Sequence, residues 1–105
     1  MLTPLRLGIV VARIDGWPTA IGLAEAALRR GSDVRLFAMD QALAPTALGS
    51  VTAALSTLAE AGAAIVFCAT ACDAHGSSVP NGIELGSQLD HARTLQWATR
   101  VVALT

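Results

Sequence analysis

Two cysteines and a histidine lie within eight residues, in the stretch "IVFCATACDAHGSS" from 65 to 78. Cys68 ends an apolar run, Cys72 follows four residues later, and His75 three residues after that. A cysteine thiolate is both a nucleophile and a metal ligand, and a free cysteine is also a common small core residue. The segment therefore supports three hypotheses, which are a reactive thiol, a metal site, and ordinary packing.

The metal hypothesis uses Cys68, Cys72 and His75 as ligands, with Asp73 or His91 as a fourth. Structural zinc sites usually have four ligands, often as two close pairs, and the sequence offers no second pair. A disulfide between Cys68 and Cys72 is a further alternative. If the segment is helical, the two thiols lie one turn apart and would need distortion to bond.

The elements around the cysteines favour a reactive position. Residues 64–68 are typical of a buried strand, and the small polar residues after Cys68 predict the opening of a short helix. A thiol at the N-terminus of a helix is near the positive end of the dipole, which lowers thiol pKa values. His75 is a candidate thiolate stabiliser. Position alone does not separate this hypothesis from that of a packed cysteine.

Strands and helices alternate along the whole chain. Strands are predicted at 7–12, 34–39, 64–68 and 101–104, with a short extended piece at 83–85 after a "PNG" turn. Helices are predicted at 18–30 and 51–61 and from Ser87 to about Thr99. This order predicts an α/β fold in three layers, a mostly parallel sheet of about five strands with helices on both faces. Ligands of such sheets bind beyond the carboxyl ends of the strands, where Cys68 lies, and we expect its strand to be central.

Several residues have expected local roles. Ser50 is a candidate N-cap of the second helix, and Ser87 with Asp90 resembles a capping box for the last one. We expect His91 to be a solvated surface residue. Three apolar residues should form the inner face of the last helix, namely Leu89, Ala92 and Leu95.

Three other residues could lie near the same edge of the sheet. Asp15 and Asp40 each follow a predicted strand, and aspartates there are more often turn or cap residues than catalysts. Trp17 could roof a pocket, but packing or an interface is the simpler expectation for it.

Composition narrows the classes of function. The 105 residues fit one domain, 1–105, and the seven basic residues are scattered arginines, so neither nucleic acid nor a membrane surface is an expected partner. No phosphate-binding loop is present, which gives nucleotide cofactors no support. Only 14% of residues are charged, and two explanations stay open: a buried subunit interface, and an alanine-rich composition that inflates the hydrophobic count without adding much apolar area.

The expected location is the cytoplasm. The longest charge-free stretch, 41–59, is interrupted by Pro45 and Gly49, which argues against a membrane-spanning helix. No signal peptide is recognised at the N-terminus. Two cysteines in such a chain are expected to be reduced.

The segment "CATACDAHG" resembles the surroundings of the active cysteine in the DsrE/TusD/YchN-like sulfur-relay proteins. That family carries a cysteine at the end of a strand and, eight residues on, the glycine of an Arg-Gly pair. Cys68 and Gly76 keep this spacing, while His75 stands where the family has arginine. The stretches "ALRRGSDVRLFAMDQAL" and "GIELGS" are also similar, so the likeness spans nearly the whole chain.

The resemblance implies a flavodoxin-like or DsrE-like fold, assembly into homotrimers or homohexamers, and sulfur carried as a persulfide on Cys68. Its partners would be sulfur donor and acceptor proteins, and no cofactor or metal is required. Cys72 has no counterpart in the family, and its proximity makes it a candidate resolving thiol. The alternatives are a non-catalytic structural or regulatory subunit of such an oligomer, and the metal-binding module.

Overall fold

A five-stranded, all-parallel sheet is the central layer of the molecule, which a computed structural model describes for residues 5–105. The strands lie in the order β4-β3-β2-β1-β5, so the chain adds strands outward from β1 and then returns to place β5 on its other side. Their bounds are β1 (Arg6–Val11), β2 (Asp33–Ala38), β3 (Ala64–Cys68), β4 (Glu84–Gly86) and β5 (Arg100–Leu104). The predicted α/β class is confirmed. The strand of Cys68 is interior, as expected, but β2 rather than β3 is the middle strand.

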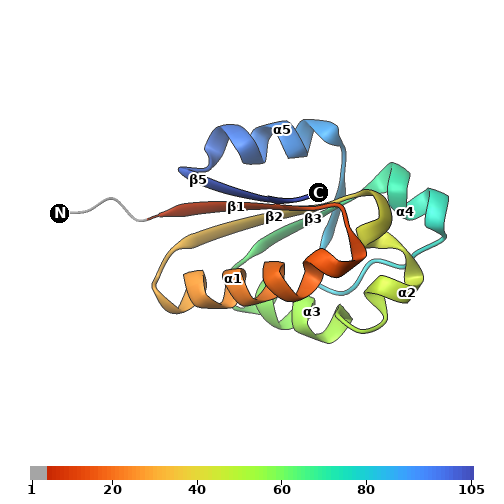
Figure 1. Cartoon of the computed structure of the whole chain (residues 1–105), viewed down its shortest axis with the longest axis horizontal. Coiled ribbons are helices and arrows are strands. Elements are labelled where there is room, and N and C mark those ends of the chain that lie inside the picture. Colours follow the sequence, from red (N-terminus) through yellow and green to blue (C-terminus); the bar gives the residue numbers. More distant parts are fainter. Residues whose placement is uncertain (1–4) are drawn as a thin grey trace.

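The helices are distributed unequally over the two faces of the sheet (Figure 1). α1 (Trp17–Arg29) and α3 (Thr52–Glu60) cover one face, and α5 (Gln88–Trp97) alone covers the other. Short elements lie past the carboxyl ends of the strands, namely η1 (Ile14–Gly16), η2 (Asp40–Leu43), α2 (Pro45–Leu48) and α4 (Ala69–His75). No helix among residues 5–105 has both the length and the hydropathy needed to cross a bilayer.

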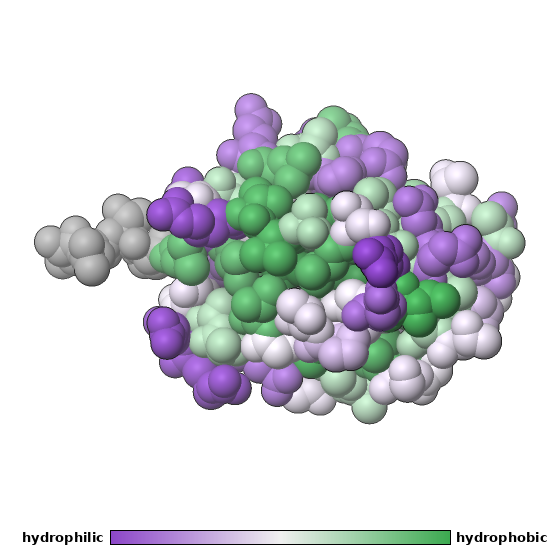
Figure 2. Space-filling view, viewed as in Figure 1, coloured by the Kyte–Doolittle hydropathy of each residue, from purple (hydrophilic) through white to green (hydrophobic). Residues whose placement is uncertain are grey.

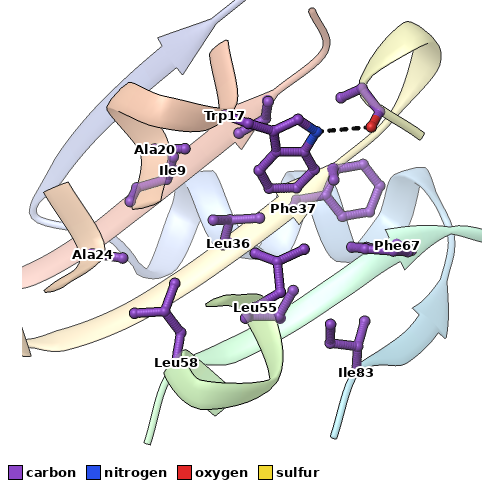
Figure 3. Close-up of a cluster of buried hydrophobic side chains, with 14 of the residues drawn as sticks. Ile9, Trp17, Ala20, Ala24, Leu36, Phe37, Leu55, Leu58, Phe67 and Ile83 are labelled. Atoms are coloured by element: carbon purple, nitrogen blue, oxygen red, sulfur yellow. Dashed lines mark hydrogen bonds between the residues drawn. The ribbon is translucent and has the colours of Figure 1, made fainter. Parts of the chain in front are cut away.

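The main core lies between the sheet and the α1/α3 layer (Figure 3). Trp17, at the start of α1, is 1% exposed, and the centre of its ring lies 6.4 Å from the ring centre of Phe67 on β3. Its indole Nε1–H donates to the carbonyl of Ala42 at 2.8 Å, the dashed line in Figure 3. Trp17 is therefore a packing residue, and it joins α1 to the η2 segment.

On the opposite face, α5 approaches the sheet closely. A Cβ added to Gly8 of β1 would lie 2.9 Å from Cβ of Ala98 and 3.3 Å from Cγ2 of Thr94. Thr94 is buried, whereas Leu89 and Leu95 are 56% and 42% exposed, so the expected inner face of Leu89, Ala92 and Leu95 is wrong.

The residues that α5 turns to the sheet match an unusual sheet surface. His91 stacks on Phe37 of β2, and the guanidinium of Arg35, also on β2, lies 4.3 Å from the ring centre of Trp97. An aromatic and cationic surface of this kind accepts rings as well as aliphatic side chains. The apolar stripe of α5 is consequently left outside.

Local signals in the sequence gave mixed results. β3 has the predicted bounds, and the capping box of Ser87 and Asp90 is confirmed. Ser50 is not the cap of α3, because Val51 occupies the N-cap position and the Ser50 hydroxyl donates to the carbonyl of Ala47 at 3.2 Å. Ala47 belongs to the short helix α2, which precedes Ser50. Because the Ser50 hydroxyl bonds back to this helix, it does not cap α3.

Candidate functional site

Cys68 is the last residue of β3 and the N-cap residue of α4. Its backbone is still extended, with φ −64° and ψ 116°, so the chain turns from strand to helix directly after it. The predicted short helix is thus confirmed. α4 ends at Gly76, whose φ of 64° is in the left-handed region that glycine adopts without strain.

The β3–β4 ladder brings a distant segment to Cys68. Cys68 pairs with Gly86, the last residue of β4, and α5 begins two residues later. A side chain at Gly86 would collide with the carboxylate of Asp90 and with Val66. The glycine therefore allows the capped end of α5 to lie directly over β3.

A groove of about 740 Å³ opens at this corner of the sheet. Its walls come from η2, from Cys68 and α4, and from the start of α5, and they comprise Asp40, Gln41, Cys68, Thr70, Ala71, Ala74, His75, Ser87 and Gln88. Cys68 and His75 both line this groove. Cys68 retains 7% of its surface exposed, so a reactant would reach its sulfur only by entering the groove.

Gln88, the first residue of α5, is the only side chain among residues 5–105 that is placed to donate a hydrogen bond to the Cys68 sulfur. Its amide Nε2 lies 4.0 Å from Sγ of Cys68 and 3.6 Å from Sδ of Met39. Its Oε1 lies 2.9 Å from Nδ1 of His91. Sequence reasoning missed Gln88, because only the pairing of β4 with β3 brings it to Cys68.

His91 is not the solvated residue expected from the sequence. It is half-buried, and its ring lies parallel to that of Phe37, with centroids 5.2 Å apart and 7° between the planes. The stacking and the contact with Gln88 hold the imidazole between the sheet and the groove. The sequence did offer one signal of this contact, because residues three apart on a helix, such as Gln88 and His91, lie on the same face.

His75 is held by the loop that follows β2. Its Nε2 lies 3.1 Å from the backbone carbonyl of Asp40, and because a carbonyl only accepts, Nε2 carries the proton of this hydrogen bond. Asp40 has a positive φ of 52°, an uncommon conformation that aspartate tolerates better than most residues. No hydrogen bond joins His75 to Cys68 among residues 5–105, so thiolate stabilisation by His75 stays a prediction.

Cys72 is separated from the groove. It is 5% exposed within the main core, and burial, together with the nearby Cys68, raises the pKa of the Cys72 thiol above its ordinary value of 9.0. Both cysteines are free. The expected role as a resolving thiol stays a prediction, and the neutral form of a buried thiol is the less reactive one.

The positions of Cys68, Cys72 and His75 do not support the metal-binding alternative. Within residues 5–105, no three histidine, cysteine or acidic side chains are grouped so that they could hold a metal ion. His91, a suggested fourth ligand, is directed to Gln88 and Phe37 instead.

Asp15 has an ordinary surface role. Its carboxylate pairs with the guanidinium of Arg13 at 2.9 Å, and both side chains are largely exposed. The two residues line a smaller hollow of about 330 Å³ between the ends of β1 and β5. Exposed ion pairs of this kind contribute little to the free energy of folding. Asp15 therefore fits the turn role expected from the sequence.

No protein-family model and no curated protein sequence matches the chain. Solved structures do match it. The crystal structure of YchN from E. coli superposes with a TM-score of 0.68 at 20% identity, covering 96% of this chain and 99% of the other. MTH1491, a protein of unknown function from Methanobacterium thermoautotrophicum, superposes with a TM-score of 0.66 at 13% identity, covering 94% of this chain and 98% of the other. At these identities the likeness establishes a YchN-like fold.

Proposed function

We propose that this protein is a sulfur carrier that accepts sulfane sulfur as a persulfide on Cys68 and passes it to a partner protein. In the first step the Cys68 thiolate attacks the outer sulfur of a donor persulfide. The new S–S bond forms on Cys68, and the donor's S–S bond breaks so that its thiolate leaves. An acceptor thiolate then attacks the same outer sulfur and releases the Cys68 thiolate, with no net oxidation in either step.

The observation that carries this proposal is the place of the Cys68 thiol in the groove. The thiol is free, it ends an interior strand, and among residues 5–105 the only side-chain hydrogen-bond donor to its sulfur is the amide nitrogen of Gln88. An exchange reaction needs a thiolate, a polar neighbour that tolerates its charge, and room for the second sulfur. The YchN-like fold and the spacing of Cys68 and Gly76 support the same conclusion.

The other two predicted site residues have supporting roles in this proposal. His75 lies on the groove wall and supplies a polar, ionisable side chain where the resembling family has arginine. Cys72 is the candidate resolving thiol: its thiolate would attack the Cys68 sulfur of the persulfide, form a Cys68–Cys72 disulfide and release the outer sulfur as sulfide. Because Cys72 is buried and lies outside the groove, this role requires α4 to move.

Assembly of several copies is part of the proposal. Apolar side chains remain exposed on both edges of the sheet and along the outside of α5, namely Leu85, Leu89, Leu95 and Val101. Figure 2 shows hydrophobic residues gathered over the β5 edge, between α5 and α1. Covering this surface in a homotrimer or homohexamer would explain why the chain has so few charges. The donor and acceptor would be proteins of the cytoplasm, a compartment in which thiols stay reduced.

A second candidate function is a non-catalytic subunit of such an assembly. The small exposed fraction of Cys68, 7%, favours it, because a packed cysteine has the same burial. The two functions differ in one measurable property, which is whether the Cys68 sulfur reacts with a sulfane donor.

The deciding experiment is an intact mass measurement after incubation of the reduced protein with glutathione persulfide. Wild type, Cys68→Ser and Cys72→Ala are treated side by side, and a small thiol treated in parallel shows that the donor is active. We expect a gain of about 32 Da, one sulfur, in Cys72→Ala and none in Cys68→Ser; wild type keeps the gain unless Cys72 resolves the persulfide, in which case it loses two hydrogens to a disulfide instead. Absence of the gain in both Cys72→Ala and wild type would eliminate the carrier function and leave the non-catalytic subunit.

A further inference from the structure

Four side chains from three segments of the chain form a connected set beside the groove, and two of them, Cys68 and Gln88, line it. The amide of Gln88 is placed between the sulfurs of Cys68 and Met39 on one side and the imidazole of His91 on the other. The amide nitrogen has two hydrogens, so it can donate to both sulfurs at once. Met39 directly follows β2, and Cys68 is the last residue of β3. The amide of Gln88 therefore lies across the carboxyl ends of two neighbouring strands.

The protonation of His91 Nδ1 would decide which end of the Gln88 amide faces the sulfurs. When Nδ1 of His91 carries a proton, it donates to Oε1 of Gln88, and the NH₂ group then points to Cys68. Without that proton the amide would turn, because Nδ1 would accept from NH₂, and the amide oxygen would then face the sulfur. An oxygen lone pair beside a thiolate is unfavourable, whereas an N–H donor stabilises it. Stacking on Phe37 keeps the imidazole in place for this contact.

An outer sulfur on Cys68 would not fit between Sγ and Nε2 of Gln88, but to one side of that line it could accept a hydrogen bond from the amide. Nε2 lies 4.0 Å from Sγ, a long separation for a hydrogen bond. An outer sulfur would be bonded about 2.05 Å from Sγ. That atom would lie in the groove, within reach of the same amide hydrogen.

We propose that Gln88, oriented by His91, is the hydrogen-bond donor that stabilises negative charge on the sulfur of Cys68 and on the outer sulfur of its persulfide. Gln88 touches the reacting atoms, and His91 acts through Gln88 as a positioning residue. This inference deepens the proposed carrier function and depends on it for the persulfide state. The contact with the bare thiolate does not depend on it.

Other ionisable groups face the same corner and must be separated from this effect. Asp40 on η2 and His75 on α4 line the groove, and Cys72 lies behind Cys68 on α4. Asp90 on α5 is engaged by the backbone N–H of Ser87 at 2.8 Å. None of these is changed in the variants below, apart from Cys72, which is replaced throughout.

The test measures the rate of Cys68 alkylation by iodoacetamide against pH, in a Cys72→Ala background that leaves one thiol. Gln88→Leu removes the donor, and because Gln88 is exposed, folding should be unaffected. His91→Phe keeps a ring over Phe37 but loses Nδ1–H. The matched control is Gln96→Leu, the same substitution at an exposed position on the same helix.

We expect the midpoint of the pH profile to rise by about 0.5–1 pH unit in Gln88→Leu, which is up to a tenfold loss of thiolate at a given pH below it. His91→Phe should shift it in the same direction, and Gln96→Leu should not. A Gln88→Leu profile that superposes on that of the background would overturn the inference. A shift in Gln88→Leu without one in His91→Phe would overturn the positioning role of His91.

The persulfide part is read separately, from the fraction of protein that gains one sulfur at a low concentration of glutathione persulfide. We expect this fraction to fall several-fold in Gln88→Leu and to be unchanged in Gln96→Leu. If the same fraction of both variants gains a sulfur, the proposed contact between Gln88 and the outer sulfur is wrong. If the background protein itself gains no sulfur, the proposed function fails, while the alkylation profile still decides whether Gln88 contacts the thiolate.

Discussion

Cys68 and Gly86 are partners in the parallel ladder between β3 and β4. This pairing determines the composition of the site, because the two residues that follow Gly86 are the N-cap and the first residue of α5. The amide of Gln88 reaches the thiol only while α5 begins at this point. The site therefore depends on the absence of a side chain at residue 86.

Replacing Gly86 tests that dependence. In Gly86→Ala the added Cβ meets the Asp90 carboxylate and Val66, so either the capping box opens or α5 moves away from β3. We expect a loss of about 1–3 kcal/mol in the free energy of unfolding, typical of overpacking, measured by urea denaturation. Iodoacetamide alkylation of Cys68 should lose its dependence on Gln88 in the same protein.

The control for this substitution is Gly22→Ala in α1, where an added Cβ has nothing within 4 Å. Alanine is the better helix former, so this variant should gain about 0.5–1 kcal/mol. A Gly86→Ala protein as stable as wild type would show that α5 tolerates displacement.

Cys72 should give the protein an alkaline limit of stability. Because its pKa in the folded protein is raised, the unfolded chain loses this proton first, and stability that is present below about pH 9 is lost as the pH rises through the folded pKa. The slope can reach about 1.4 kcal/mol per pH unit. Unfolding free energies of wild type and Cys72→Ala from about pH 8 to about pH 10 measure it, and parallel curves would contradict the prediction.

Trp17 should be the more important of the two tryptophans for stability. Trp17→Phe leaves the Ala42 carbonyl without its donor and leaves a void beside Phe67, and we expect a cost of about 2–4 kcal/mol. Trp97→Phe is the comparison, because phenylalanine retains a ring for the Arg35 guanidinium at a half-buried position. We expect less than about 1 kcal/mol for it, since a half-exposed ring leaves no closed cavity. Equal losses in urea denaturation would mean that the two faces of the sheet are packed alike.

The outer face of α5 should control assembly. Leu89→Glu with Leu95→Glu places two charges on exposed positions, so the free energy of unfolding of the single chain should change little, while an oligomer buried there should dissociate. Sedimentation equilibrium measures the mass of both proteins, with Gln96→Glu on the same helix as the control. A wild type that sediments as a monomer would contradict the proposed assembly.

The sequence allowed accurate prediction wherever a local signal was sufficient. The apolar, β-branched run gave the bounds of β3, and Ser87 with Asp90 gave the start of α5, because strand and cap signals depend on neighbours in the chain.

Apart from the Ser50 cap, which a local contact with Ala47 removed, the missed features depend on contacts between distant segments. The apolar stripe of α5 predicted an inner face, but the sheet surface beneath it carries Arg35 and Phe37, so the opposite stripe faces inward. His91 was expected in solvent for the same reason. Gln88 could not be identified, because a three-residue strand gives no signal for the strand that it will join.

The shortness of β4 has a consequence for motion in the native state. Three residues join it to β3, and it is the edge of the sheet, so few hydrogen bonds hold this side of the groove. Segments with few such bonds open locally at a lower free energy than the whole protein unfolds. Amide hydrogen exchange in β4 and the first turn of α5 should thus be faster than in β1 and β2. The wall that screens Cys68 would then belong to the least protected part of the sheet, and its opening would expose the thiol while the Trp17 core stays folded.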